Sequence, residues 1–247
     1  MFFGIIAKKL LGIFMKIDLG KNIKAFYTTI YDGNMAYYTT NDKLSVDNNR
    51  QNIALKYDFD INELKYMNQI HGNRIEVVDS SSPSQILECD GIVTKEPNLP
   101  LMVQVADCIG VMFYDSVLDI IGVAHAGRNG TFLGISSQMV SKMIDTFGSN
   151  PKDIKVNLSP SIQKCCYEVD ANMAEFVANN FGSEFTKGRF IDLQGINKMQ
   201  LIKSGIIEEN INISTICTKC SNQPYFSYRN DSGCGRFAGV VVINSKS

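Results

Sequence analysis

The chain has 247 residues, 45% of them hydrophobic, so it can bury a sizeable core as one domain without covalent staples. Its formal net charge is -1, and its 24 basic and 25 acidic residues are mixed along the sequence. No basic stripe follows from this pattern, which excludes nucleic acid as an expected partner. We expect a monomer or a small homo-oligomer.

The cysteine count and the first residues bear on location. Seven cysteines with no regular spacing indicate reduced thiols in a cytoplasmic protein rather than a disulfide framework. The first 14 residues are apolar but contain Lys8 and Lys9, lack a small-residue cleavage site and are too short to span a bilayer. We therefore expect no membrane span. Met15 follows directly, so residues 1–14 form a leader whose translation the sequence leaves open, and residues 15–247 form a single domain.

Hydrophobic patterns along the chain predict both strands and helices. A helix is predicted over Thr131–Phe147, and a second follows Asp170, which is a suitable N-cap, and ends near Phe181. Strands come both in clusters and alternating with helices, which predicts an α/β fold of the α+β type, a single domain with a mixed β-sheet and packed helices. The predicted strands are Arg74–Val78, Leu101–Val105, Val111–Tyr114, Ile120–His125, Ile154–Leu158, Ile211–Ile216 and Phe237–Ile243.

Three residues are candidate metal ligands. The only histidines, His71 and His125, each stand at or beside the end of a strand-like run and are followed closely by glycine, which lets the backbone approach a ligand. Cys108 ends another apolar run. Zinc binds imidazole nitrogen and thiolate sulfur, and three protein ligands with one open position are typical of a catalytic zinc site. Ordinary histidines and a core cysteine are the alternative at this stage.

Polar residues near these ligands are candidates for catalysis and substrate binding. Asp107 interrupts an apolar run, and a buried aspartate is costly unless it is hydrogen-bonded or orients a ligand, so we assign it a catalytic role. Arg229 and Arg236 flank a glycine-rich turn, where guanidinium groups could bind phosphate, although a solvated hairpin is the alternative. The helix start after His125 is a further candidate anion site. The predicted substrate-binding residues are Arg50, Gln69, Arg229 and Arg236.

A second group of cysteines offers a competing metal site. Cys217 and Cys220 form a C-x-x-C pair, which Cys165, Cys166 or Cys234 could complete. A zinc ribbon normally needs two such pairs, and a thioredoxin-like use needs a helix after the first cysteine. Separate reduced thiols are the favoured interpretation.

Several motifs resemble one known family. The segments are NQIHG, CDGIVTKEPNLPLMVQVADC, HAG, LSPSIQKCCYEVD, and CT followed by FSYRNDSGCGR. In this order they resemble the signatures of the laccase-domain family, also known as multicopper polyphenol oxidases, over Phe26 to Ile243. The resemblance implies a single-domain α/β fold and a zinc site formed by His71, Cys108 and His125.

The resemblance also implies a reaction. Members phosphorolyse the purine nucleosides adenosine, inosine, guanosine and methylthioadenosine, and deaminate adenosine as a second reaction. Copper is the less favoured metal, because a multicopper centre needs more than two histidines. A copper- or zinc-dependent polyphenol oxidase is one alternative. A nucleoside- or metal-binding module with weakened catalysis is another.

The sequence departs from the family pattern at two places. The family usually has Trp-Arg after His-Ala-Gly, whereas this chain has Arg128 and Asn129. The early Ser-Thr-Arg motif appears as Thr28, Thr29 and Ile30. Both departures leave the candidate metal ligands intact and bear on substrate affinity.

Overall fold

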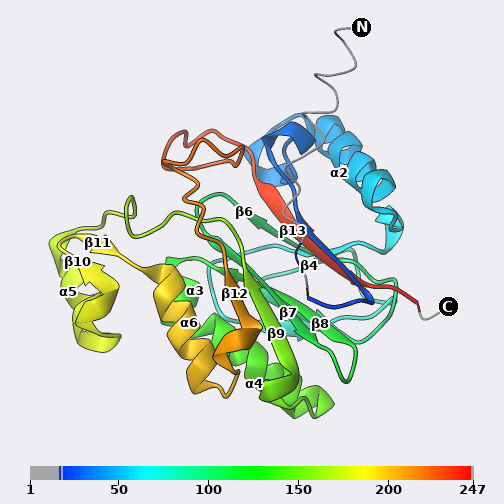
Figure 1. Cartoon of the computed structure of the whole chain (residues 1–247). Helices are drawn as coiled ribbons and strands as arrows, with labels where there is room; N and C mark the ends of the chain where they lie inside the picture. Colours follow the sequence, from blue (N-terminus) through cyan, green and yellow to red (C-terminus); the bar gives the residue numbers. More distant parts are fainter. Residues whose placement is uncertain (1–16, 18, 246–247) are drawn as a thin grey trace, which may run out of the picture.

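Two mixed β-sheets lie face to face at the centre of the protein (Figure 1). The computed structural model describes residue 17 and residues 19–245, so the leader expected at residues 1–14 lies outside the described part. One sheet has the strand order β1 (Ile23–Tyr27), β13 (Phe237–Ile243), β6 (Leu101–Val105), β2 (Lys65–Met67), β4 (Gln85–Ile86). The other has the order β12 (Ile211–Ile213), β9 (Ile154–Leu158), β7 (Ile109–Asp115), β8 (Ile120–Ala126), β5 (Gly91–Thr94), β3 (Ile75–Val77).

Helices cover the outer face of each sheet, and the whole forms one domain. Helix α2 lies against the five-stranded sheet and α3, α4 and α6 against the six-stranded one (Figure 1). A two-stranded hairpin, β10 (Thr186–Lys187) and β11 (Phe190–Ile191), packs beside α5. The helices are α2 (Lys43–Tyr57), α3 (Arg128–Phe132), α4 (Ile135–Phe147), α5 (Ala171–Asn180) and α6 (Leu193–Lys203).

Side-chain alternation explains why the central strands are apolar on both faces. On β7, Met112 and Tyr114 pack between the two sheets, whereas Val111 and Phe113 pack under the helices. On β13, Val241 faces the other sheet and Val240 faces α2. The mixed α/β single-domain fold is confirmed. In place of the one expected sheet there are two large sheets and a two-stranded hairpin, because an apolar run does not reveal whether a helix or a second sheet covers it.

The predicted elements agree with the structure in part. The predicted helix over Thr131–Phe147 is two helices, because Gly134 has φ 75° and ends α3 before α4 begins. Helix α5 begins as predicted, with the Asp170 carboxylate accepting a bond from the Met173 N–H at 2.8 Å. Among the described residues, no helix is both long and apolar enough to cross a membrane.

Two helices and several strands were missed. Helix α2 buries only Val46, Arg50, Ile53 and Ala54, and the buried face of α6 includes polar side chains such as Asn197, so neither has a continuous apolar stripe. The missed strands β1, β2, β4, β5, β10 and β11 are two to five residues long, which is too short for a clear pattern.

Strand directions bring several loops to one edge of the domain. Strands β2, β4 and β6 run parallel, so their carboxyl ends lie together. After each of them the chain crosses to the six-stranded sheet, through residues 68–74, 87–90 and 106–108. The start of β13 pairs with the end of β6, and the end of β8 pairs with the start of β7. All of these strand ends therefore lie together at one edge of the domain.

Candidate active site

The three candidate metal ligands converge at this shared edge. His71 lies on the crossover after β2, Cys108 on the crossover after β6, and His125 near the end of β8. Their ligand atoms all lie within 4.8 Å of one another. The two imidazole rings meet edge to face, with centroids 4.7 Å apart and an interplanar angle of 79°. One small ion can therefore reach all three donors, which are types that zinc accepts.

Gly127 makes this convergence possible. A Cβ atom at this position would lie 3.0 Å from His71 Cδ2, 3.1 Å from Cys108 Sγ and 3.5 Å from His125 Cε1. A side chain here would crowd His71 and Cys108, so the glycine two residues after His125 leaves room for the donors to converge. The glycine after His71 is not crowded in this way, because the nearest atom to its Cβ position is 3.5 Å away. Here His71 itself has the unusual backbone, with φ 61°.

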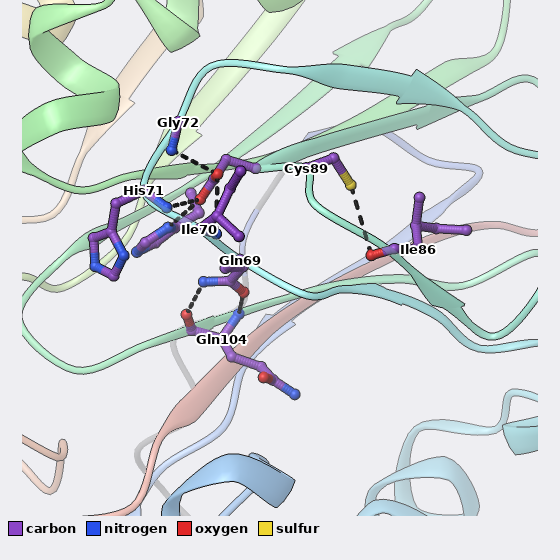
Figure 2. Close-up of polar contacts among 9 residues, drawn as sticks. Gln69, Ile70, His71, Gly72, Ile86, Cys89 and Gln104 are labelled. Atoms are coloured by element: carbon purple, nitrogen blue, oxygen red, sulfur yellow. Dashed lines mark hydrogen bonds and ion pairs between the residues drawn. The ribbon is translucent and has the colours of Figure 1, made fainter.

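A carboxylate that the sequence did not single out holds the site together. Asp90, on the crossover after β4, is fully buried. Its Oδ2 accepts bonds from the N–H groups of Ile70 and Gly72 at 3.2 and 2.7 Å. Its Oδ1 accepts from the His71 N–H at 3.0 Å and lies 2.8 Å from His125 Nδ1. Figure 2 shows the three consecutive peptide N–H groups pointing toward one carboxylate.

Asp90 fixes which ring nitrogen of His125 is free. Because Nδ1 bonds to the carboxylate, Nε2 faces the other ligands, the arrangement usual for imidazoles that bind a metal. Burial would raise the pKa of Asp90, but the bonds from His125 and from the N–H groups of Gly72 and Ile70 outweigh burial and lower it. The feature of the sequence that could have indicated this role is Asp90 followed by Gly91, at the start of the buried strand β5.

Asp107 has a different task from the one expected. Its Oδ1 accepts a bond from Thr218 Oγ1 at 2.6 Å, and its Oδ2 accepts from the Arg229 N–H at 2.7 Å. Asp107 therefore ties the segment between β12 and β13 to the crossover that carries Cys108. Of the two alternatives for a buried aspartate at this position, hydrogen bonding is the one observed, and the contact with a ligand imidazole belongs to Asp90. A direct catalytic role for Asp107 stays a prediction.

Cys108 and His125 stabilise each other's charged forms. Burial would raise the pKa of the Cys108 thiol, but the nearby His125 and His71 rings bring it down to about 6. Burial would lower the pKa of His125, but Cys108 and Asp90 raise it to about 9. At neutral pH the pair is therefore a thiolate beside an imidazolium, and a metal ion would take the place of the imidazolium proton.

Two cavities meet at the candidate ligands. The larger, about 450 Å³, holds His125, Gln69, Gln104, Tyr38 and Arg236 in its wall. The smaller cavity has a volume of about 270 Å³. His71, Ala106, Cys108 and Tyr228 line both. The wall of the smaller cavity also includes Asp107, Arg128, Asn129, Tyr167 and Arg229.

The predicted substrate-binding residues fall into three places. Gln69 and Arg236 line the larger cavity, and Gln69 makes a paired amide contact with the Gln104 backbone at 2.8 and 2.9 Å (Figure 2). Arg229 lines the smaller cavity. Arg50 lines neither, because it is buried between two tyrosine rings and donates two bonds to the Met35 carbonyl at 3.0 and 2.7 Å. We leave Arg50 out of the functional proposal.

The smaller cavity brings two arginines near the candidate ligands. Arg128, the residue after Gly127, lies in its wall beside Asn129, although the family pattern puts arginine one position later. The Arg229 guanidinium lies 4.9 Å from the centre of the Tyr167 ring and donates one bond to the Glu168 carbonyl at 3.1 Å. Helix α3 has only five residues, so we propose no anion site at its start.

Four cysteines are not separate, contrary to the favoured interpretation. The thiols of Cys165, Cys166, Cys217 and Cys220 lie within 4.8 Å of one another. Cys234 is not part of this group. The sequence suggested a C-x-x-C pair but could not show that a segment about fifty residues upstream supplies two more sulfurs.

Comparison with known proteins decides the family. The model of the family described as "Multi-copper polyphenol oxidoreductase laccase" matches residues 24–244. The chain belongs to this laccase-domain family. Its relatives include Purine nucleoside phosphorylase YlmD of Bacillus subtilis, 32% identical over 209 residues, covering 78% of this chain and 75% of the relative. Another is Purine nucleoside phosphorylase Rv2149c of Mycobacterium tuberculosis, 33% identical over 212 residues, covering 84% and 83%.

Solved structures of family members have the same fold. The hypothetical protein YfiH of Bacillus licheniformis superposes with a TM-score of 0.87 at 29% identity, covering 94% of this chain and 96% of that one. YlmD of Geobacillus stearothermophilus superposes with a TM-score of 0.86 at 27% identity, covering 94% and 99%. The fold of this chain is therefore shared with these two solved structures.

We expect Asp90→Asn to weaken metal binding about 10- to 100-fold, because the amide cannot accept all the bonds that fix the His71 loop and the His125 ring. Asp107→Asn is the matched control. The Asp107 side chain bonds to Thr218 and Arg229 and to neither imidazole, and asparagine tolerates the positive φ of this position. The measurement is the metal retained after dialysis against a series of chelator concentrations. Equal weakening in both variants would contradict the role given to Asp90.

In the metal-free protein, the rate of Cys108 alkylation should rise with pH around a midpoint of about 6, because His125 and His71 favour the thiolate. Cys234 serves as an internal control, since burial raises its pKa. The rates are read by peptide mass spectrometry over a pH series. His125→Gln should move the Cys108 midpoint upward, and an unshifted midpoint in this variant would rule out the pairing.

Proposed function

We propose that this laccase-domain protein is a zinc-dependent purine nucleoside phosphorylase that also deaminates adenosine. The observation that carries the proposal is the position of the candidate ligands: His71 and Cys108 line both cavities, His125 lines the larger, and two arginines line the smaller. A reaction of two substrates needs two adjoining sites with the reacting atoms at their boundary. The names of the relatives point to the same reaction class.

The donor set supports zinc as the metal. One thiolate and two imidazoles match a three-ligand zinc site with an open position, and Gly127 leaves room for the donors to converge. Copper in a multicopper centre would need many more histidines than the two in this sequence. When bound, the ion would supply Lewis-acid chemistry, which polarises an oxygen atom held against it.

Phosphorolysis assigns one substrate to each cavity. The nucleoside would occupy the larger cavity, where the side chains of Gln69, Tyr38 and Arg236 can contact base and ribose. Phosphate would occupy the smaller one, where Arg128 and Arg229 neutralise its charge. A phosphate oxygen forms a bond to the anomeric carbon as the bond from that carbon to the purine nitrogen breaks. The purine nitrogen keeps the electron pair and takes a proton, giving purine and ribose 1-phosphate.

Deamination of adenosine would use the same larger cavity without phosphate. The oxygen of a water molecule bonds to the purine carbon that carries the amino group, and the amine takes a proton and leaves as ammonia, giving inosine. The side chains here would position the base. This branch needs no anion site, which separates the two reactions experimentally.

The two departures from the family pattern affect this proposal differently. Arg128 lines the phosphate cavity, so a guanidinium remains there although its position in the sequence is shifted by one. Ile30, at the other altered position, lies in neither cavity wall and is 42% exposed. The Ile30 departure therefore removes no contact from the site that we propose.

Two alternatives give different products. A phenol oxidase would consume oxygen with a phenolic substrate, and a binding module would hold nucleoside or metal without turnover. Incubating the purified protein with adenosine, with and without phosphate, and separating the products by chromatography distinguishes all three. We expect adenine and ribose 1-phosphate only with phosphate, and inosine in both conditions. Oxygen uptake with phenols and no nucleoside product would overturn the proposal.

Arg229→Ala should slow phosphorolysis roughly 30- to 1000-fold, because losing a charge-assisted bond to phosphate in a partly dry site costs about 2 to 4 kcal/mol. Deamination should change much less. Arg189→Ala is the matched control, since Arg189 pairs with Glu168 of the same segment but lines neither cavity. Equal losses in both branches of the Arg229 variant, with normal folding, would rule out a phosphate-specific role.

A further inference from the structure

The cluster of four cysteines lies where two distant segments meet. Cys165 and Cys166 follow β9, and Cys217 and Cys220 follow β12. The Cys165 sulfur lies 3.7 Å from that of Cys166 and 3.6 Å from that of Cys220. All four sulfurs fit within 4.8 Å of one another.

These distances match one ion better than a disulfide. Sulfurs about 2.3 Å from a central zinc at the corners of a tetrahedron lie about 3.8 Å apart. A disulfide needs a separation of about 2.05 Å, and the cysteines of the described residues are all free thiols. A [4Fe–4S] cluster binds each thiolate to a different iron, and a [2Fe–2S] cluster divides the four thiolates between two irons, so either would spread the sulfurs farther apart than one ion does. A single metal ion is therefore the ligand that fits.

Backbone hydrogen bonds hold the two segments together without using the thiols. The Thr218 N–H donates to the Ser161 carbonyl at 3.0 Å, and the Ser161 N–H donates to the Ile216 carbonyl at 3.3 Å. A tight turn, in which the N–H groups of Cys166 and Tyr167 both donate to the Gln163 carbonyl at 2.9 Å, presents the first pair of cysteines. The site is thus already formed before an ion binds.

The surroundings suit a thiolate centre that is separate from the candidate active site. Four thiolates around a divalent ion leave a net charge of about −2. A lysine precedes one cysteine of each pair in the chain, at Lys164 and Lys219. None of the four cysteines lines either cavity at His71.

We propose that Cys165, Cys166, Cys217 and Cys220 bind a second zinc ion with a structural role. Four thiolates fill the tetrahedron and leave no open position for a substrate, which is the mark of a structural site. The chain would therefore bind two zinc ions, and the second assignment holds whether or not the proposed nucleoside chemistry is correct.

This ion would brace one wall of the candidate active site. Cys166 is followed by Tyr167, which lines the smaller cavity and lies under Arg229. Cys217 is followed by Thr218, whose hydroxyl donates to Asp107 beside Cys108. Clamping the two segments together fixes both contacts. Losing the ion should lower the thermal stability and loosen this wall.

The test is the zinc content of the full-length protein, measured by elemental mass spectrometry. The protein is purified under reducing conditions without added chelator. We expect about two zinc ions per chain in the wild type and about one in Cys217→Ser/Cys220→Ser, with a lowered melting temperature. Cys108→Ala should also retain about one. Cys234→Ser, which changes a thiol outside the cluster, should retain both.

A second measurement covers the case in which the double variant does not fold. X-ray absorption at the zinc edge of Cys108→Ala should show a shell of four sulfurs. A shell containing nitrogen, or no zinc in this variant, would overturn the proposal. So would a metal-free wild-type cluster, iron in place of zinc, or an intact mass showing that two of the four thiols had been lost to a disulfide.

Discussion

The buried carboxylate of Asp90 is the constraint on which the candidate active site depends. It binds three consecutive peptide N–H groups on one side and the His125 ring on the other, so one group sets both the shape of the His71 loop and the tautomer of the second histidine. A buried charge is stable only when it is fully hydrogen-bonded, and here its partners are the elements that carry the ligands. The cost of burying this charge is therefore offset by the same contacts that organise the site.

Strand direction explains why the carboxylate and the ligands meet at all. Three parallel strands of one sheet end at the same edge, and after each the chain crosses to the second sheet. These crossovers carry His71, Asp90 and Cys108, while β8 returns His125 to the same edge. Loops that bridge two packed sheets are held at both ends, so the donors keep their positions without a ligand. The cavities on either side of His71 follow from the same arrangement.

The proposed structural zinc site and the candidate active site have no ligand residue in common, but they adjoin through one wall of the smaller cavity. Thr218 donates a hydrogen bond to Asp107, and the Tyr167 ring lies against the Arg229 guanidinium in the wall of the smaller cavity. The segments that carry these residues would be fixed by the cysteine cluster and by the bridge between Ser161 and Cys217. The candidate active site, held by crossovers between the two sheets, would thus gain a second restraint from the segments that follow β9 and β12.

Residue types and motifs predicted the candidate ligands and the class of fold. Two histidines, each followed closely by a glycine near a strand end, and a cysteine that closes an apolar run suggested one donor set, with ordinary histidines and a core cysteine as the alternative, and the family motifs indicated the fold. Tertiary structure decided which groups meet. Asp90 and the cysteine pairs have partners 18 to 55 residues away, and no local pattern encodes contacts of that range. The same reason explains Asp107 and Arg50. The sequence suggested a catalytic role for the first and substrate binding for the second, but only packing shows that Asp107 bonds to a neighbouring loop and that Arg50 bonds to a carbonyl between two tyrosine rings.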